Sequence, residues 1–257
     1  NLYLKLDNQV SFRNLQSDWY QLERLEKVKK MKDYIPPSFE EKELEITNAI
    51  STLKRHGINI QLPENLSKQF AAKTLFDGDD GLFKELIKHA KTYYEYGCGK
   101  STEFVFKYSS ATIFSVDTSN DWVKKIKSLE GIEKSKRLNL SWVDVGEIAN
   151  WGTPTSFKMK HNFRNYAELL WLNNEIPDLV LIDGRFRILC FLTSIKFAPS
   201  GCKILFDDYI DRPFYHIVED FCPKLETCGR QALFEVSEIA KEKVSEDLIK
   251  SFQNVIL

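Results

Sequence analysis

Residues 92–102 read Thr-Tyr-Tyr-Glu-Tyr-Gly-Cys-Gly-Lys-Ser-Thr, and this stretch decides which fold the 257-residue chain can adopt. Its first half is mostly aromatic and predicts a β-strand. After Lys100, apolar residues at helical spacing (Phe104, Val105 and Tyr108) predict a helix. Glycines between a strand and a helix let the backbone approach a ligand, and the helix start offers unpaired N–H donors. The stretch therefore predicts a strand–loop–helix unit that binds a ligand.

The rest of the chain after this unit alternates between strand-like and helix-like segments. Strands are predicted at 112–117, 138–145, 178–183 and 202–207, and helices at 80–91, 120–130 and 186–197. The predicted strands are apolar with little alternation, which is typical of strands that are covered on both faces. This order predicts a Rossmann-like α/β fold, with a mostly parallel sheet and helices on both faces. After residue 222 we expect an antiparallel pair of strands, the second at 232–236.

The first part of the chain has a different pattern. Apolar residues are spaced for one face of a helix before Pro36-Pro37, and a second helix is expected to begin after Ser38. We therefore divide the chain into a helical N-terminal extension at 1–75, a ligand-binding domain at 76–240 and a C-terminal helix at 241–257.

Composition argues against several classes of protein. The 36 Lys and Arg residues against 37 Asp and Glu give a net charge of −1, which argues against a nucleic-acid partner. A hydrophobic fraction of 43% argues against disorder. No apolar run reaches the roughly 18 residues that span a bilayer, and residues 1–7 lack the pattern of a secretory signal. Five cysteines without a CxxC pair, and only four histidines, argue against a zinc finger. We expect reduced thiols, a cytoplasmic location and no membrane partner, and the sequence leaves a homo-oligomer open.

Three kinds of glycine loop were compared with the stretch at 92–102. A phosphate-binding P-loop would need glycine in place of Tyr94, and a dinucleotide fingerprint would need glycine in place of Thr102. What remains is an acidic residue, Glu95, followed by Gly-x-Gly, with Asp117 at the end of the next predicted strand. This pattern resembles the S-adenosylmethionine loop of class I methyltransferases.

The resemblance implies a seven-stranded sheet and S-adenosylmethionine as the cofactor. In that family the glycine loop packs against the methionine part of the cofactor, and the acid after the second strand binds both ribose hydroxyls. Two carboxylate oxygens suit two neighbouring hydroxyls, which makes Asp117 the residue expected to bind the ribose. Glu95 is expected to order the loop or the ligand's amino end, and Asp144 either to reach the adenine or to cap a loop. The predicted cofactor-binding residues are Glu95, Gly97, Gly99, Lys100, Ser101, Asp117 and Asp144.

Three carboxylates follow the later strands. Asp183 ends the strand at 178–183, and Asp207-Asp208 end the strand at 202–207, so all three are expected at one edge of the sheet. They would repel one another unless they are protonated or neutralised by a cation. Oxygen ligands favour Mg²⁺ over Mn²⁺ or Ca²⁺. The arrangement resembles the divalent-metal catechol and caffeoyl-CoA O-methyltransferases, in which such residues hold the metal.

Arginines near these carboxylates leave two other interpretations open. Arg185, Arg187 and Arg212 could pair with Asp207 and Asp208 without a metal, or could hold a carboxylate or phosphate of a substrate. The residues predicted to contact substrate are Arg185, Arg187, Tyr209 and Arg212. The string from Asp178 to Arg187, followed by Asp-Asp-Tyr at 207–209, resembles a little-characterised branch of bacterial class I methyltransferase-like proteins.

Asp183 and His216 are the predicted catalytic residues. The ordinary pKa of histidine is near neutrality, which suits a general base, although a surface or capping histidine is the alternative for His216. Trp142, Trp151 and Trp171 are expected to pack in the core or a lid rather than to stack on a ligand.

We expect O-methylation of a small polar or anionic acceptor, with or without a divalent metal. The alternative is a catalytically silent cofactor-binding or scaffold protein on the same fold.

Overall fold

The computed structural model describes residues 75–76, 78–132 and 135–256. The predicted helical extension at 1–75 lies almost entirely outside these residues. Within them, none of the helices has both the length and the apolar composition needed to cross a membrane.

Seven strands form one sheet, which confirms the predicted seven-stranded, mostly parallel architecture. The order across the sheet is β3-β2-β1-β4-β5-β7-β6. Strands β1 to β5 run parallel, and β7 is antiparallel to both β5 and β6. The strands are β1 (Thr92–Tyr96), β2 (Thr112–Asp117), β3 (Leu138–Trp142), β4 (Leu179–Ile182), β5 (Lys203–Phe206), β6 (Lys224–Cys228) and β7 (Gln231–Glu235).

Strand β1 lies at the centre of the sheet, between β2 and β4, and all of its residues are buried. Its aromatic side chains fill the space beneath the helices: the Tyr94 ring lies 5.4 Å from that of Phe114 and 5.1 Å from that of Trp171. The order of the strands reverses between β1 and β4. Ligands of open α/β sheets bind beyond the carboxyl ends of the strands at such a reversal. A ligand site is therefore expected at the loops after β1 and β4.

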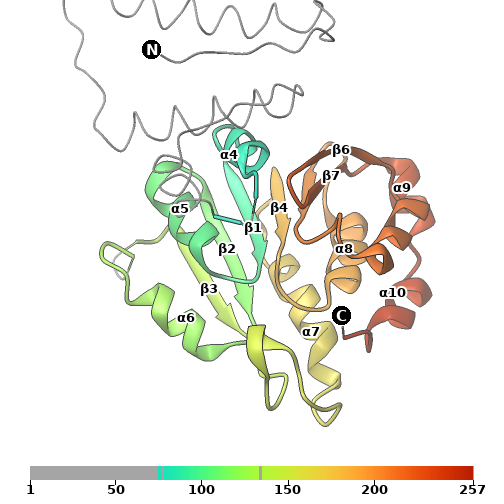
Figure 1. Cartoon of the computed structure of the whole chain (residues 1–257), viewed down its shortest axis with the longest axis horizontal. Coiled ribbons are helices and arrows are strands. Elements are labelled where there is room, and N and C mark those ends of the chain that lie inside the picture. The colour runs from blue at the N-terminus through green and yellow to red at the C-terminus, as the bar shows by residue number, and fades with distance from the viewer. Residues whose placement is uncertain (1–74, 77, 133–134, 257) are drawn as a thin grey trace, which may run out of the picture. The chain divides into compact units, whose positions relative to one another are not determined.

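Helices cover both faces of the sheet. Figure 1 shows α5 and α6 on one side and α7 and α8 on the other. Helix α8 is buried along most of its length, and it belongs to the main hydrophobic core together with residues of β1, β4, β5 and β7. The helices are α4 (Gly81–Ile87), α5 (Lys100–Tyr108), α6 (Asn120–Lys127), α7 (His161–Glu168), α8 (Arg187–Phe197), α9 (Glu238–Lys243) and α10 (Glu246–Phe252), with 3₁₀ turns η1 (Asn150–Gly152), η2 (Leu169–Leu172) and η3 (Pro213–Asp220).

Two segments differ in detail from the sequence expectations. Strand β3 ends at Trp142 and not at Val145, because its neighbour β2 ends at Asp117, directly opposite Trp142. In 241–257, α9 ends and a separate helix α10 begins, because the Ser245 side chain accepts a hydrogen bond from Leu248 N and caps a new helix. All five cysteines are buried free thiols.

Candidate functional site

The loop after β1 passes unusually close to the loop after β4. Gly97 has a φ of +96°, and its N–H donates to the carbonyl of Val116 at 2.8 Å. A Cβ on Gly97 would lie 2.8 Å from both the Cα and the N of Gly184. A Cβ on Gly184 would lie 2.1 Å from the Tyr166 hydroxyl. Both positions therefore require glycine, and Gly184 is a structural residue that the sequence prediction did not include.

Gly99 lies next in the same loop, in open surroundings. No atom comes within 4 Å of the place where its Cβ would be. Lys100 follows as the first residue of α5 and is exposed. Among the described residues, this part of the loop is therefore open to a ligand next to Gly99.

The side chains of Glu95 and Ser101 lie on the buried side of the loop and not on its open side. The Glu95 carboxylate is fully buried and accepts hydrogen bonds from the hydroxyls of Tyr93, Ser101, Thr102 and Ser115. Burial raises the pKa of Glu95, and these hydroxyl donors oppose the rise. Of the two roles expected for Glu95, the structure favours ordering of the loop, and the same applies to Ser101.

Asp117 lies at the carboxyl end of β2, beside the glycine loop. Its Oδ2 accepts from the backbone N–H of Cys98 at 2.9 Å, and its Oδ1 accepts from that of Ser119 at 2.6 Å. The Cys98 side chain also interacts with this carboxylate. Since a carboxylate has about four acceptor sites, Asp117 can still accept a hydrogen bond from a ligand. Burial raises the pKa of Asp117, while the N–H groups of Ser119 and Cys98 lower it. The carboxylate is thus fixed in orientation and retains acceptor capacity for a ligand.

A segment of the β3–β4 connection, the strap (residues 149–154), joins the end of β2 to the loop after β4. Thr118 Oγ1 donates to the carbonyl of Gly152 at 2.8 Å, and an Arg185 nitrogen lies 3.3 Å from Thr153 Oγ1. Trp151 is the exposed residue of the strap, with 84% of its surface accessible. The expectation that Trp151 packs in the core or a lid is therefore wrong, whereas Trp171 does pack against Tyr94.

Backbone strain also gathers at this edge of the sheet. Among the described residues, the non-glycine residues with positive φ are Trp151 at 64°, Phe186 at 53° and Asp208 at 55°. They lie in the strap, after β4 and after β5, respectively. Each such residue costs about 1–3 kcal/mol, and strain of this kind concentrates at functional sites. The strain therefore supports the carboxyl edge as the site.

The predicted acidic cluster is present, and Arg187 lies in its middle. Ligand oxygens of Asp183, Asp207 and Asp208 all lie within 4.8 Å of one another. Arg187, only 2% exposed, pairs with Asp183 at 3.1 Å and with Asp208 at 3.0 Å. Its guanidinium also donates to the main-chain carbonyls of Asp183, Gly184 and Asp207. One buried cation thus joins the loops after β4 and β5.

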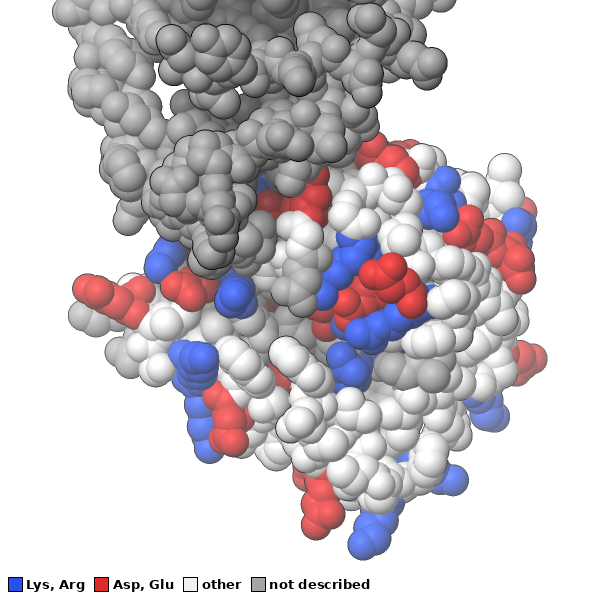
Figure 2. All heavy atoms as spheres, in the orientation of Figure 1, with Lys and Arg blue, Asp and Glu red and all other residues white. Residues whose placement is uncertain are grey.

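Two further arginines complete the neutralisation of the cluster. Arg230 binds Asp207 through Nε at 3.2 Å and through a terminal nitrogen at 2.6 Å, and reaches Asp208 at 3.0 Å. Arg212 pairs with Asp208 at 2.8 Å. Arg230 was absent from the predicted site, although it lies in the turn between β6 and β7. Acidic and basic side chains are visible side by side near the middle of the face in Figure 2.

These contacts do not fit a divalent cation at the acidic cluster. Each of the three carboxylates already pairs with a guanidinium, and the fully buried Asp207 also accepts from Gln231 at 2.9 Å. A cation there would have to displace Arg187 or lie against its positive charge. The alternative left open by the sequence, pairing with arginines, is the one that the geometry favours.

Asp183 differs from the other two acids because one side of it stays accessible. Its side chain is 27% exposed. Burial and the neighbouring Asp207 carboxylate raise the pKa of Asp183 well above its usual range, and Arg187 opposes the rise. The raised pKa and the partial exposure make Asp183 the acid of the cluster that can exchange a proton with a bound molecule.

Comparison with known proteins agrees with this geometry. No family model and no curated protein matches the chain. Among solved structures, a methyltransferase-like protein from Silicibacter pomeroyi is 25% identical, with a TM-score of 0.58, over 76% of this chain and 97% of that one. The chain has the class I methyltransferase-like fold.

Two enzyme structures with this fold match at lower similarity. An N-methyltransferase from Bradyrhizobium japonicum in complex with S-adenosyl-L-homocysteine is 10% identical, with a TM-score of 0.41, over 67% of this chain and 98% of that one. An O-methyltransferase from Bacillus cereus in complex with the same compound is 16% identical, with a TM-score of 0.40, over 86% and 97%.

Three predicted residues of the class I site have other roles. Tyr209 is fully buried and its hydroxyl donates to Glu219 at 2.8 Å, so that hydroxyl is already engaged within the protein. His216 Nε2 lies 3.1 Å from the carbonyl oxygen of Tyr209, and its ring packs on the Tyr209 ring at 4.7 Å. Because a carbonyl oxygen only accepts, Nε2 carries a proton and donates to it, and this contact is the one expected for the surface or capping alternative for His216. Asp144 is exposed and accepts from Gly146 N at 2.9 Å, as a loop cap does.

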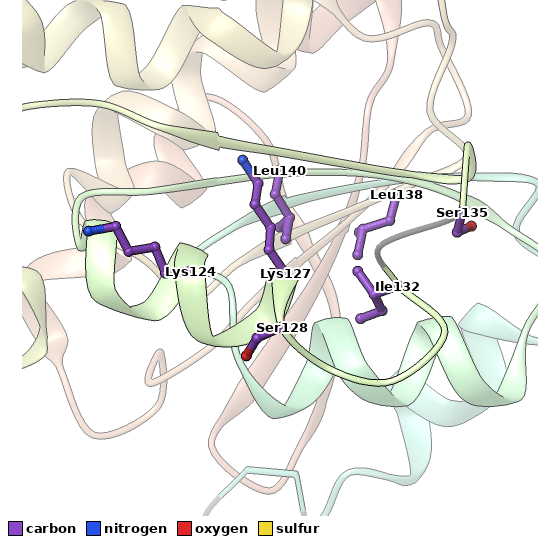
Figure 3. A pocket seen from close by; sticks show the side chains of 7 residues that line it. All are labelled: Lys124, Lys127, Ser128, Ile132, Ser135, Leu138 and Leu140. Atoms are coloured by element: carbon purple, nitrogen blue, oxygen red, sulfur yellow. The ribbon is translucent and has the colours of Figure 1, made fainter.

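A cavity of about 490 Å³ lies between α6 and β3, away from the site. Figure 3 shows that its lining residues come from α6, from the β3 strand and from the segment that joins them. Leu138 and Leu140 lie toward the start of β3, whereas the candidate site is at the carboxyl ends of the strands. Among the described residues, the lining offers two lysines, two serines and three apolar side chains but no carboxylate for ribose hydroxyls. We therefore keep the site at the loops after β1, β2, β4 and β5.

Proposed function

We propose that this protein is an S-adenosylmethionine-dependent methyltransferase that methylates an oxygen of a small polar or anionic acceptor. The observation that carries the proposal is the Asp117 carboxylate, fixed beside the Gly97–Gly99 loop at the strand reversal. The likeness to the Silicibacter pomeroyi methyltransferase-like protein supports it.

The residues of the loop fit the cofactor for distinct reasons. Asp117 is held by two backbone N–H groups and has acceptor capacity left for ribose hydroxyls. The open side of Gly99 lets the backbone approach the ligand. Glu95, below the loop, keeps the start of α5 in place through Ser101 and Thr102. When bound, the cofactor supplies a methyl group on a positively charged sulfur, which is already a strong electrophile.

The chain must still align the acceptor and remove a proton from it. Transfer of the methyl group to the acceptor oxygen would leave that oxygen with a proton to lose. The hydroxyl proton then needs an acceptor, and we assign this role to the ionised form of the Asp183 carboxyl, whose side chain is partly exposed. Arg187 orients the Asp183 carboxylate from the buried side. No step requires a metal ion at the acidic cluster.

Calorimetric titration with S-adenosylhomocysteine tests the cofactor assignment. The Asp117→Ala variant should bind more than about tenfold more weakly, because hydrogen bonds to a charged group contribute about 1.5–3 kcal/mol each. Asp121→Ala, which removes an exposed carboxylate from the first turn of α6, is the matched control and should bind normally. A wild-type protein that does not bind S-adenosylhomocysteine would refute the function, and an unchanged Asp117→Ala affinity would refute the ribose assignment.

The arginine pairs also favour a second candidate, a catalytically silent cofactor-binding protein. Every carboxylate of the acidic cluster is engaged by a guanidinium, and His216 is engaged by a main-chain carbonyl. Such a protein would bind S-adenosylmethionine tightly, yet would transfer no labelled methyl group to any member of a panel of hydroxy acids and phosphorylated alcohols. Transfer that is lost in Asp183→Asn while binding persists would decide for the enzyme.

A further inference from the structure

Arg185 differs from the other arginines of the site because it is not neutralised within the cluster. The carboxylates of Asp183, Asp207 and Asp208 pair with Arg187, Arg212 and Arg230. The Arg185 side chain has one weak contact, 3.3 Å from a terminal nitrogen to Thr153 Oγ1. Its Nε is buried and has no hydrogen-bond partner. Part of a guanidinium has thus been taken out of water without a protein acceptor, which is costly unless a ligand supplies one.

A second unpartnered donor belongs to the same surroundings. Tyr215, from η3, is fully buried, and its hydroxyl also has no partner. Its ring packs against Phe206 at 4.9 Å and lies under the Arg187 guanidinium at 5.8 Å. Burial lowers the pKa of Arg185, the positive charge of Arg187 adds to this effect, and Tyr215 lies close enough to act in the opposite direction. The region therefore holds two buried donors that have no acceptor among the described residues.

The geometry points to an anion-binding site at Arg185, assisted by the Tyr215 hydroxyl, for a carboxylate or a phosphate. A guanidinium has a planar array of donors that matches the oxygens of both groups. Arg185 lies close enough to Asp117 to lower the pKa of that carboxyl, and it follows Asp183 by two residues, so we place the anion near the proposed ribose and acceptor positions. The anion is therefore either the carboxylate of the cofactor's amino acid or an acidic group of the acceptor. The inference rests on the proposed function only for the identity of this source.

Calorimetry with three probes separates the sources. S-adenosylhomocysteine and 5′-methylthioadenosine share the nucleoside and the sulfur, but only the first carries a carboxylate. If the cofactor supplies the anion, Arg185→Gln lowers the affinity for S-adenosylhomocysteine by about tenfold or more and leaves the affinity for 5′-methylthioadenosine unchanged. If the acceptor supplies it, both nucleosides bind normally, and inorganic phosphate or acetate binds the wild-type protein but not Arg185→Gln.

Further variants guard against a folding artefact. Arg164→Gln removes an arginine that already pairs with Glu168 and Glu246, and it should leave every affinity unchanged. Arg185→Lys should restore part of the loss, because it keeps the charge without the planar fork. Tyr215→Phe removes only the unpartnered hydroxyl. It should lower the affinity for the same probe as Arg185→Gln does, by a smaller factor.

The proposal is overturned if wild type and Arg185→Gln bind S-adenosylhomocysteine, phosphate and acetate equally. It is also overturned if both nucleosides lose affinity together, because 5′-methylthioadenosine has no carboxylate. If the wild-type protein does not bind S-adenosylhomocysteine, the proposed function alone is refuted. The phosphate and acetate titrations would then still decide whether Arg185 binds an anion.

Discussion

Replacing Arg230 with methionine should destabilise the protein strongly, even though Arg230 lies in a surface turn. Its guanidinium binds both oxygens of Asp207, at 3.2 and 2.6 Å, and Asp207 is fully buried. Removing one partner of a buried ion pair costs about 3–5 kcal/mol, because the remaining charge is left in a poor solvent. Gln231 still donates to Asp207, and the Arg230 side chain is 22% exposed, so we take the lower end, about 3 kcal/mol. For a domain of this size, that corresponds to a decrease of about 6–12 °C in Tm.

Urea denaturation followed by circular dichroism measures this loss. The matched control is Arg164→Met, whose partners are partly exposed; its loss should be below about 1 kcal/mol. Adding Asp207→Asn to Arg230→Met should recover part of the stability, because the unpaired charge is then removed. Mg²⁺ alone should leave the wild-type Tm unchanged, since the carboxylates are already paired. A loss in Arg230→Met no larger than that of the control would refute the assignment of the cluster as arginine-neutralised.

Two further predictions follow from the loops and from the titration of the site. Gly97→Ala should lower the free energy of unfolding by at least about 2 kcal/mol, because the new Cβ would lie 2.8 Å from the Gly184 backbone at a φ of +96°. Gly99→Ala, in contrast, should fold normally and weaken only S-adenosylhomocysteine binding. Equal stability of the two alanine variants would contradict this difference. Burial and the Asp207 carboxylate raise the pKa of Asp183 in the folded state, so the folded protein holds that proton more tightly than the unfolded chain. Stability should therefore fall as pH rises from about 4, the unfolded value, through the raised folded pKa. The urea midpoint of Asp183→Asn should therefore change less with pH than that of the wild-type protein. The same pH dependence in both proteins would contradict the raised pKa of Asp183.

The elements that were predictable are those whose signal is local. Apolar runs at 112–117 and 178–183 indicated strands, and the Gly-x-Gly loop with Asp117 after the next strand indicated where a ligand would bind. Parallel strands bring their carboxyl ends to one edge whatever the details, so the grouping of Asp183 with Asp207 and Asp208 followed from topology.

The positions of the residues that the sequence analysis missed or misassigned depend on strand register and on the direction in which a side chain turns. Arg230 precedes β7, and β7 runs antiparallel to β5 with Ala232 opposite Phe206. An antiparallel strand at that place must begin at the carboxyl edge, so the expected pair after residue 222 contained a usable signal for Arg230. Tyr209 was assigned to the substrate from its position after Asp208, but nothing local shows that its side chain turns inward toward Glu219. Left-handed backbone at Phe186 and Trp151 likewise has no signature in a single sequence.

Arg187 explains why a buried network of charges is retained where apolar residues could pack. Replacing buried ion pairs with apolar groups is often neutral or stabilising, so stability alone does not account for it. The guanidinium instead contacts Asp183 and Gly184 after β4 and Asp207 and Asp208 after β5. An apolar side chain would fill the space without fixing two irregular loops against each other, and one of them carries the accessible carboxyl of Asp183. The network also leaves the Arg185 guanidinium outside its ion pairs, which is why we propose that an anion binds there.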